Sequence, residues 1–407
     1  MATMSAPTDQ PSLLRRALPP VALLAGLTAV AVGLMILGDR EGGPRLLAVI
    51  QDLLGNHEQA QLLRLGSGER LPAKLLLSVV ALAVGVGGVW LLYIGANSLI
   101  ESLGPRWRTR LVPWLFVGPA MALLGVYLAY PVIQTILTSL TEDGGFATNY
   151  GALLSQPMLR TFRNNLYWLV VATGGSVILG LVIAALVDRV RFEALAKTFI
   201  FLPLAISLVG ASVIWKFVYA WAPANQPQYG LLNAVVTEAG GAPVNWLQAQ
   251  GSGLLGELTA FLPTLFQSPG MNTYALIVIM VWLQTGFAMV VLSAAIKGVS
   301  SEVLESARLD GASERQLFFQ VIVPIIKGSI ITVTTTIAIV VLKIFDIVYV
   351  TTGGRADTNV VANQMFQEMF NFFNDGKAAA LAVVLFLAVV PIMVVNVRNL
   401  RRQGIDG

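Results

Sequence analysis

Two opposite charges lie three residues apart within one long apolar stretch of the sequence. Lys343 and Asp346 follow the uncharged run that begins at Gly328, and Asp346 is the one acid well inside such a run. Residues three apart share a helix face, and a charge among apolar residues needs a partner or a polar cavity. Two interpretations stay open: a self-neutralising pair at a helix end, or side chains that line a cavity. A lone acid beside a cation argues against proton coupling.

Residues that enzymes use for nucleophilic, metal-assisted or redox chemistry are scarce. The chain has no cysteine and one histidine, His57, which gives no support to disulfides, zinc sites or Ser–His pairs. The phosphate-binding motif G-x-x-x-x-G-K-[ST] does not occur, because Asp375-Gly376-Lys377-Ala378 lacks the hydroxyl and the upstream glycine. We therefore expect no catalytic residue, no metal site and no cofactor in this chain.

The composition indicates which elements carry these residues. Of 407 residues, 56% are hydrophobic and 12% are charged, against about 45–50% and about 25% in soluble domains. Apolar runs long enough to cross a bilayer, or nearly so, cover 17–38, 75–100, 111–141, 164–187, 198–215, 258–296, 328–342 and 378–397. The sequence predicts an all-α membrane protein with about eight transmembrane helices.

Basic residues predict the orientation of these helices. The short turns at 101–110 and 188–197 are rich in Lys and Arg, whereas 221–271 contains neither. Because cytoplasmic loops carry the excess of Lys and Arg, we expect both termini in the cytoplasm and the long loops 39–74 and 221–271 outside. The net charge of +4 has the same explanation, and we expect no nucleic-acid partner.

The first apolar run allows two interpretations. Arg15 and Arg16 precede it and Ala29-Val30-Ala31 resembles a cleavage site, as in a signal peptide. The run is too long for a typical signal core, which favours a retained helix. We expect a two-helix extension over 1–110 and a six-helix core over 111–402.

The segment 299–324, between the sixth and seventh predicted spans, has the pattern of two short helices joined by a turn. Asp310-Gly311 ends the first helix, because glycine tolerates the left-handed backbone of a helix end. Apolar residues recur at helical spacing on both sides, namely Val303, Leu304, Ala307, Leu317, Phe318, Val321 and Ile322. Such an element either fills a groove in a soluble partner or packs along the membrane surface as a linker.

This segment resembles the EAA loop of permease subunits of bacterial ABC importers. It reads Glu305-Ser306-Ala307, then Asp310-Gly311-Ala312 and Val323-Pro324, with Ser306 where the family has alanine. The similarity extends over 111–402 and is strongest to the larger permease of maltose-type transporters and to permeases for α-glucosides and related glucoside osmolytes. Its other motifs are Asn164-Asn165, Leu202-Pro203-Leu204, Trp282-x3-Gly286-Phe287 and Phe345-Asp346, with Gly353-Gly354-Arg355 in place of the usual Gly-Gly-Pro.

The resemblance implies a pore-forming, non-catalytic subunit in the bacterial inner membrane. Its partners would be a second permease subunit, two ATPase subunits that bind the ATP and Mg²⁺, an extracytoplasmic sugar-binding protein, and the sugar. The contact with an ATPase would be made by Glu302, Glu305, Ser306, Ala307, Asp310, Gly311, Ala312 and Phe318. The alternative is a stand-alone secondary sugar carrier or a membrane scaffold, which would have no reason to display such a loop.

By position in the family, the fifth and seventh spans would line the sugar pathway. The candidates for sugar contacts are Trp215, Tyr219, Thr336, Lys343 and Asp346. These residue types suit a pyranose, which has apolar C–H faces and a polar rim. An interfacial aromatic belt is the other explanation for Trp215 and Tyr219.

Overall fold

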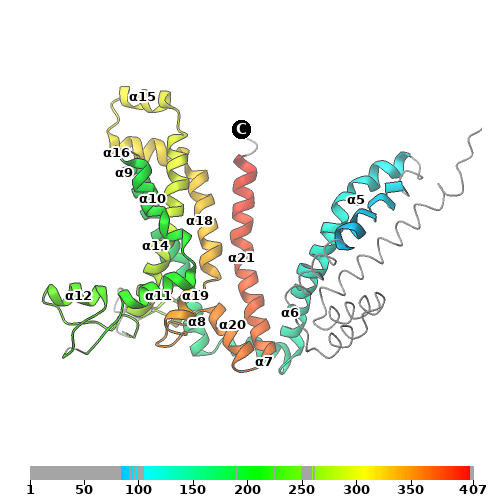
Figure 1. Cartoon of the computed structure of the whole chain (residues 1–407), viewed down its shortest axis with the longest axis horizontal. Helices are drawn as coiled ribbons and strands as arrows, with labels where there is room; N and C mark the ends of the chain where they lie inside the picture. Colours follow the sequence, from blue (N-terminus) through cyan, green and yellow to red (C-terminus); the bar gives the residue numbers. More distant parts are fainter. Residues whose placement is uncertain are drawn as a thin grey trace, which may run out of the picture. The chain divides into compact units, whose positions relative to one another are not determined.

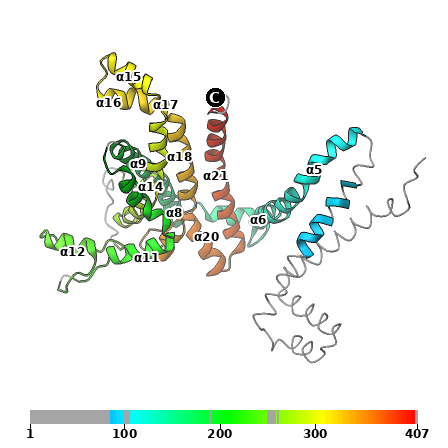
Figure 2. The same cartoon turned by 45° about the horizontal axis from the view of Figure 1, so that its top comes forward.

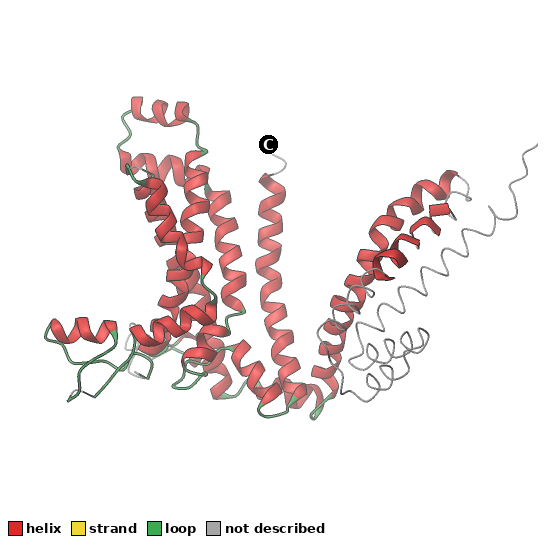
Figure 3. Cartoon of the chain, viewed as in Figure 1, coloured by secondary structure: helices red, strands yellow, loops and turns green. Residues whose placement is uncertain are grey.

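The computed structural model describes residues 84–91, 93–95, 97–98, 105–188, 190–223, 225–248, 259 and 262–403. These residues form helices and loops, with no strand among them (Figure 3), which confirms the all-α class. The predicted first span and the loop 39–74 lie outside the described residues, and the second span is described in part. The signal-peptide alternative also lies outside them.

The described helices include four that are long and apolar enough to cross a membrane: Phe116–Thr141, Gln156–Val187, Met271–Lys297 and Asp375–Asn399. Two bent pairs, Glu193–Ala205 with Leu208–Val218 and Glu314–Ile325 with Lys327–Leu342, raise the number to six if each pair is one span. The six correspond to the third to eighth predicted spans, although several boundaries differ.

The fifth predicted span, 198–215, is not one straight helix. α10 (Glu193–Phe201) and the 3₁₀ turn η3 (Leu202–Ala205) meet α11 (Leu208–Val218) at 102°. Pro203 lies in the turn, and Ser207 caps α11 by accepting a hydrogen bond from the backbone N–H of Gly210 at 3.0 Å. A proline followed by a strong N-cap residue explains why one apolar run becomes two helices.

The sixth predicted span begins later than the apolar run does. α14 covers Met271–Lys297, and the residues described from 262 to 270 form a loop around the 3₁₀ turn η4 (Thr264–Phe266). Pro263 and Pro269 lack the backbone N–H that a helix interior needs. The apolar residues before Met271 therefore extend a loop rather than the helix.

By compactness the chain divides into two units, Met1–Pro131 and Val132–Gly407. In the first unit, α5 (Pro105–Leu124) runs into a π-helical turn, η1 (Gly125–Ala129), and α6 (Tyr130–Thr141) leads into the second unit. Trp114, Phe116 and Tyr127 are exposed. The predicted boundary at 110 between an extension and a core stays a prediction.

The second unit is a helical bundle built around α14. Its remaining elements are α7 (Gly145–Ala152), α8 (Gln156–Tyr167), η2 (Trp168–Ala172), α9 (Thr173–Val187), α12 (Leu231–Glu238), α15 (Ser301–Leu309), α16 (Glu314–Gln316), η5 (Leu317–Ile322), α17 (Val323–Ile325), α18 (Lys327–Leu342), α19 (Asp346–Thr351), α20 (Val361–Phe370) and α21 (Asp375–Gln403). α15 and the carboxyl end of α21 lie at one end of the bundle, and α12 and α20 lie at the other (Figures 1 and 2).

Close packing of small residues holds α14 against α9. A Cβ added to Gly180 would lie 2.5 Å from the Cβ of Ala288, and one added to Gly286 would lie 2.5 Å from the carbonyl oxygen of Ile200 in α10. Both distances are far below van der Waals contact. Without a hydrophobic drive between helices in lipid, such close backbone approach is a main source of attraction.

We predict that Gly180→Ala destabilises the bundle, because the added methyl group overpacks α9 against α14. We expect the free energy of unfolding to fall by about 2 kcal/mol, measured by thermal unfolding of the purified protein in detergent. Gly174→Ala is the matched control on the same helix, since nothing lies within 4 Å of its added Cβ. Equal stability of the two variants would contradict the packing argument.

Candidate functional site

The loop from α14 to α18 begins with α15, which a glycine ends. Gly311 has φ +85°, the backbone N–H of Ala312 donates to the carbonyl of Ala307 at 3.1 Å, and that of Gly311 donates to the carbonyl of Arg308 at 3.0 Å. This pair of hydrogen bonds is the Schellman motif, which satisfies carbonyls at a helix end. The prediction that Asp310-Gly311 ends the first helix is confirmed.

The second half of the loop starts with a capping box. Ser313 accepts from the backbone N–H of Gln316 at 3.4 Å, and the Gln316 side chain accepts from the backbone N–H of Ser313 at 2.9 Å. α16, η5 and α17 then form one helical segment up to Ile325, after which the chain bends by 69° into α18. The predicted second helix is therefore present, and Pro324 lies in its last turn.

One side of this loop packs onto the end of the bundle. Leu317, Ile322 and Ile326 are buried in a cluster with residues of α9 and α14, such as Leu181 and Ile296. Of the predicted coupling residues, Ala307 and Phe318 pack against this cluster. The loop is thereby held to the helices through direct side-chain contact.

The other side of the loop is exposed and carries both acidic and apolar side chains. Five of the predicted coupling residues are exposed, namely Glu302, Glu305, Ser306, Asp310 and Gly311, while Ala312 is half-buried. Leu309 is 88% exposed and Phe319 is 61% exposed. A short helix that presents large apolar side chains at the tip of a bundle is suited to a groove in a partner protein.

An ionic network lies beside the loop, where α9 ends, α10 begins and α14 ends. The ammonium of Lys197 is 2.6 Å from carboxylate oxygens of both Asp188 and Glu193. Lys197 also donates to the hydroxyl of Ser293, which donates to Asp188 at 2.6 Å, and Lys297 donates to Glu193. Three helices are thus joined by charge at this end of the bundle.

The aromatic candidates for sugar contacts lie together on α11 and beside α14. The ring of Trp215 is centred 5.1 Å from that of Tyr219 and 5.8 Å from that of Trp282. Tyr219 is buried, and its hydroxyl donates to the carbonyl of Ala275 at 2.7 Å. Thr336 is half-buried and donates to the carbonyl of Thr332 at 2.8 Å. The tyrosine hydroxyl therefore already has a structural partner.

Lys343 and Asp346 do not share a helix face, and this prediction is wrong. α18 ends at Leu342, Lys343 follows it, and α19 begins at Asp346. Both residues belong to the described part of the chain, and they form no ion pair with each other there. Because the helix breaks between them, two residues three apart in sequence do not lie on one helix face here. The self-neutralising pair is not formed.

Lys343 instead lines a largely apolar pocket of about 600 Å³. The other lining residues come from α20, α21 and the break itself, and they are Phe345, Ala362, Met365, Phe366, Ala382, Leu385, Phe386 and Val389. A pocket of this size is in the range of small-molecule sites. Lys343 supplies a hydrogen-bonding group among apolar and aromatic walls.

A polar clamp that the sequence patterns did not predict lies at the end of the bundle opposite α15. Arg163 is 5% exposed and its guanidinium lies 2.6 Å from a carboxylate oxygen of Asp357. Asn164 donates to the carbonyls of Asp357 and Asn359 at 2.7 and 2.8 Å. The signal in the sequence is a row of three polar residues, Arg163, Asn164 and Asn165, just before an apolar run.

Proteins similar in sequence to this chain are membrane components of transport systems. The family model described as binding-protein-dependent transport system inner membrane component matches residues 176–403. The osmoprotective compounds uptake permease protein GgtC of Synechocystis sp. is 47% identical over 294 residues, which are 71% of this chain and 99% of the relative. The alpha-glucoside transport system permease protein AglF of Rhizobium meliloti is 43% identical over 316 residues, 76% and 88% of the two chains.

A solved structure shares the fold. A chain of a bacterial alginate ABC transporter, crystallised with an alginate pentasaccharide-bound periplasmic protein, aligns with a TM-score of 0.55 at 18% identity. The alignment covers 71% of the present chain and 92% of the solved one.

We predict that Lys197→Met lowers the thermal unfolding midpoint of the purified protein by a few degrees. The substitution leaves Asp188, whose side chain is 11% exposed, without its cation, and an unpaired charge of low exposure is destabilising. Lys297→Met is the matched control, because this lysine is 51% exposed and exposed ion pairs contribute little. A larger effect of Lys297→Met than of Lys197→Met would contradict the network as described.

Proposed function

The chain belongs to the family of binding-protein-dependent transport system inner membrane components, and we propose that it is the larger permease subunit of an ATP-driven importer of α-glucosides or a related glucoside osmolyte. The names of two relatives support this substrate class, since one takes up osmoprotective compounds and the other transports alpha-glucosides. The observation that carries the proposal is the exposed helix-glycine-helix loop at one end of an apolar bundle.

The distribution of charge supports a cytoplasmic location for the α15 end. Lys197, Lys297 and Arg315 belong to this end of the bundle, whereas the segment 225–248, which contains α12 at the opposite end, has neither Lys nor Arg. Lys and Arg accumulate in cytoplasmic loops. We therefore infer that both termini are cytoplasmic and that the α12 end faces the binding protein outside the cell.

The proposed assembly contains a second permease, two ATPase subunits and an extracytoplasmic sugar-binding protein. The exposed side of α15 would lie in a cleft of one ATPase, with Glu305 and Asp310 for polar contacts and Leu309 for apolar ones. Closure of the ATPase dimer on ATP would move α15. Because Ala307 and Phe318 pack on the end of the bundle, the helices would follow as rigid bodies and reverse the side on which the pathway opens.

The proposed sugar pathway uses two groups of side chains. The half-buried Trp215 offers aromatic surface for the C–H faces of a pyranose, and the buried Tyr219 would support the Trp215 ring from a centroid distance of 5.1 Å. The pocket with Lys343 combines a hydrogen-bond donor with aromatic walls. Thr336 and Asp346 are both half-buried and would accept hydrogen bonds from sugar hydroxyls.

We predict that Gly311→Asp leaves the protein in the membrane and abolishes sugar-stimulated ATP hydrolysis by the reconstituted transporter. The added Cβ would meet nothing within 4 Å, although the backbone at φ +85° is strained for a residue with a side chain. The substitution would add bulk and negative charge to the surface that meets the ATPase. Normal stimulation in this variant would refute the coupling role.

Gly240→Asp is a matched control for that experiment. Gly240 has φ +82°, ends α12 as Gly311 ends α15, and likewise has nothing within 4 Å of an added Cβ. The control therefore imposes the same backbone strain and charge at the opposite end of the bundle. We expect it to keep most of the stimulation.

The substrate class is tested by comparing linkages. We predict that binding protein loaded with maltose or trehalose stimulates ATP hydrolysis by the complete transporter, and that cellobiose, a β-linked disaccharide, does not. The measurement is the rate of phosphate release in proteoliposomes at saturating binding protein. Equal stimulation by cellobiose would remove the preference for α-glucosides while leaving the importer assignment intact.

A further inference from the structure

The loop between α19 and α20 has an unusual backbone. Gly353 and Gly354 have φ values of +63° and +79°, and two residues with side chains follow them in the same region, Ala356 at +54° and Asp357 at +61°. Residues with a Cβ rarely adopt this conformation, and it persists only where surrounding contacts hold it. Strain of this kind is concentrated at ligand sites and active sites. The loop is therefore a candidate ligand site.

A rigid set of polar contacts supplies the restraint. Arg163 pairs with the carboxylate of Asp357, Asn164 donates to its carbonyl at 2.7 Å, and Asn272 donates to the carbonyl of Ala356 at 2.6 Å. The contacts come from α8 and α14, elements of the bundle itself. The loop is thus fixed before any ligand arrives, which lowers the ordering cost of binding.

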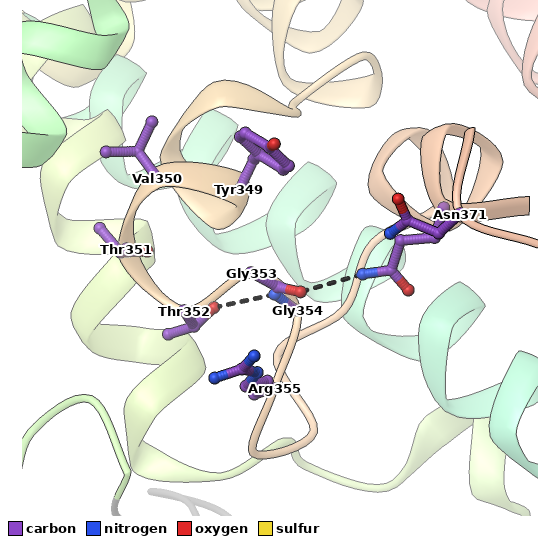
Figure 4. A pocket seen from close by; sticks show the side chains of 9 residues that line it. Tyr349, Val350, Thr351, Thr352, Gly353, Gly354, Arg355 and Asn371 are labelled. Carbon is purple, nitrogen blue, oxygen red and sulfur yellow. Dashed lines mark hydrogen bonds between the residues drawn. The ribbon is translucent and has the colours of Figure 1, made fainter. Parts of the chain in front are cut away.

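The restrained loop forms one wall of a pocket of about 570 Å³, here called the loop pocket. Its lining residues are Tyr349, Val350, Thr351, Thr352, Gly353, Gly354, Arg355, Gln367 and Asn371. Figure 4 shows Tyr349, Thr352, Arg355 and Asn371 around the pocket. The dashed lines mark the N–H of Gly354 donating to Thr352 and the carbonyl of Gly353 accepting from Gln367 at 3.0 Å (Figure 4).

Arg355 is a cation without a partner among the described residues around the loop pocket. Its side chain is exposed, and within the part of the chain that the structure describes its guanidinium has no hydrogen-bond or ion-pair partner. The neighbouring carboxylates are already taken, because Asp357 pairs with Arg163 and Glu368 pairs with Lys377 at 2.6 Å. Arg355 therefore has five N–H donors available to a ligand.

Aromatic rings connect the loop pocket with the pocket of Lys343. Tyr349 is 48% exposed in the loop pocket, and its ring stacks on Phe345 with centroids 4.9 Å apart. Phe366 lies 5.2 Å from both rings, and Phe345 and Phe366 line the pocket of Lys343. A continuous aromatic surface thus runs from one pocket to the other.

We propose that the loop pocket is a second binding site for the transported glycoside, where Arg355 and Asn371 hold sugar hydroxyls, the Tyr349 ring covers a C–H face, and the aromatic surface leads onward to the pocket of Lys343. This inference rests on the proposed function. The site lies at the bundle end opposite α15 (Figure 1), where the sugar arrives from the binding protein. The loop pocket would hold the sugar after the binding protein has released it and before the outer end of the pathway closes.

A small polyol fits these observations better than a protein partner does. The pocket is concave, its volume is in the range of small-molecule sites, and its polar groups are spread around a hollow rather than over a flat patch. Arg, Asn and Tyr together supply several hydrogen bonds and one apolar face. A docking contact to the binding protein would need only the charge of Arg355.

The test uses the complete transporter in liposomes, with ATP hydrolysis titrated against maltose- and trehalose-loaded binding protein. We expect Arg355→Ala and Tyr349→Leu each to lower the maximal stimulated rate about fivefold, the effect of losing one hydrogen bond or stacking contact. The half-saturating concentration of loaded binding protein should stay unchanged. Arg355→Lys, which keeps the charge but loses the fork of donors, should recover only part of the rate.

A direct binding readout accompanies the rates. Saturation-transfer NMR of maltose and trehalose with the detergent-solubilised transporter, without binding protein, should show a sugar signal that Arg355→Ala weakens. Arg160→Ala is the matched control, since Arg160 is an exposed cation on α8 outside the loop pocket. It should leave both readouts unchanged.

The outcomes separate the possibilities. A raised half-saturating concentration with an unchanged maximal rate in Arg355→Ala would identify a docking contact for the binding protein and overturn the proposal. Equal effects of Arg355→Ala and Arg160→Ala would also overturn it, because general surface charge would then be responsible. If the unaltered transporter is stimulated but Arg355→Ala behaves like it, only this inference fails. If no α-glucoside stimulates the unaltered transporter, the proposed function fails instead.

Discussion

The side chain of Asn165 completes the backbone hydrogen bonding at the point where α18 breaks. Its amide donates to the carbonyl of Leu342 at 3.2 Å and accepts from the N–H of Val361 at 2.7 Å. In an apolar bundle a free backbone group is costly, so the break needs such a partner. Lys343 lies in this break and lines its pocket, and α19 begins just after it and carries Tyr349 of the loop pocket. Val361, the other partner of Asn165, begins α20, which leads to Gln367 and Asn371 of the loop pocket. The pocket of Lys343 and the loop pocket therefore both depend on one buried amide and on the clamp of Arg163 and Asn164 beside it.

The helix α18 joins the two ends of the bundle mechanically. It begins next to Ile326, which is buried with Leu317 and Ile322 of the loop between α14 and α18, and it ends at the break before Lys343. In the proposed mechanism a displacement of α15 passes through this cluster into α18 and reaches the pocket of Lys343 as a rigid-body movement. The ion pairs of Lys197 with Asp188 and of Lys297 with Glu193 tie α9, α10 and α14 together at the same end. Both halves of the pathway would then respond to one movement at the cytoplasmic surface.

Features with a local cause were predictable from the sequence. Apolar runs located the described spans, and Gly311 marked the end of α15, because a helix end of this kind depends on the backbone conformation of the glycine itself. The bend before α11 and the late start of α14 also have local causes, namely Pro203 with Ser207 and Pro263 with Pro269, which the apolar runs alone did not take into account. The break at Lys343 depends instead on a contact from a distant part of the sequence. Asn165 supports the break and lies 177 residues before Leu342 in sequence. No local sequence pattern predicts a contact over that separation. The loop pocket likewise required α19 and α20 to be brought together, with α8 and α14 holding the loop between them.

The most direct test of the account is the composition of the complex that this chain forms in its native membrane. The tagged chain would be extracted in mild detergent, crosslinked in the membrane in a parallel sample, and its partners identified and counted by mass spectrometry. The account predicts one second permease and two copies of an ATPase subunit for each copy of this chain. Recovery of the chain alone or as a homo-oligomer, with the same result after crosslinking, would contradict it.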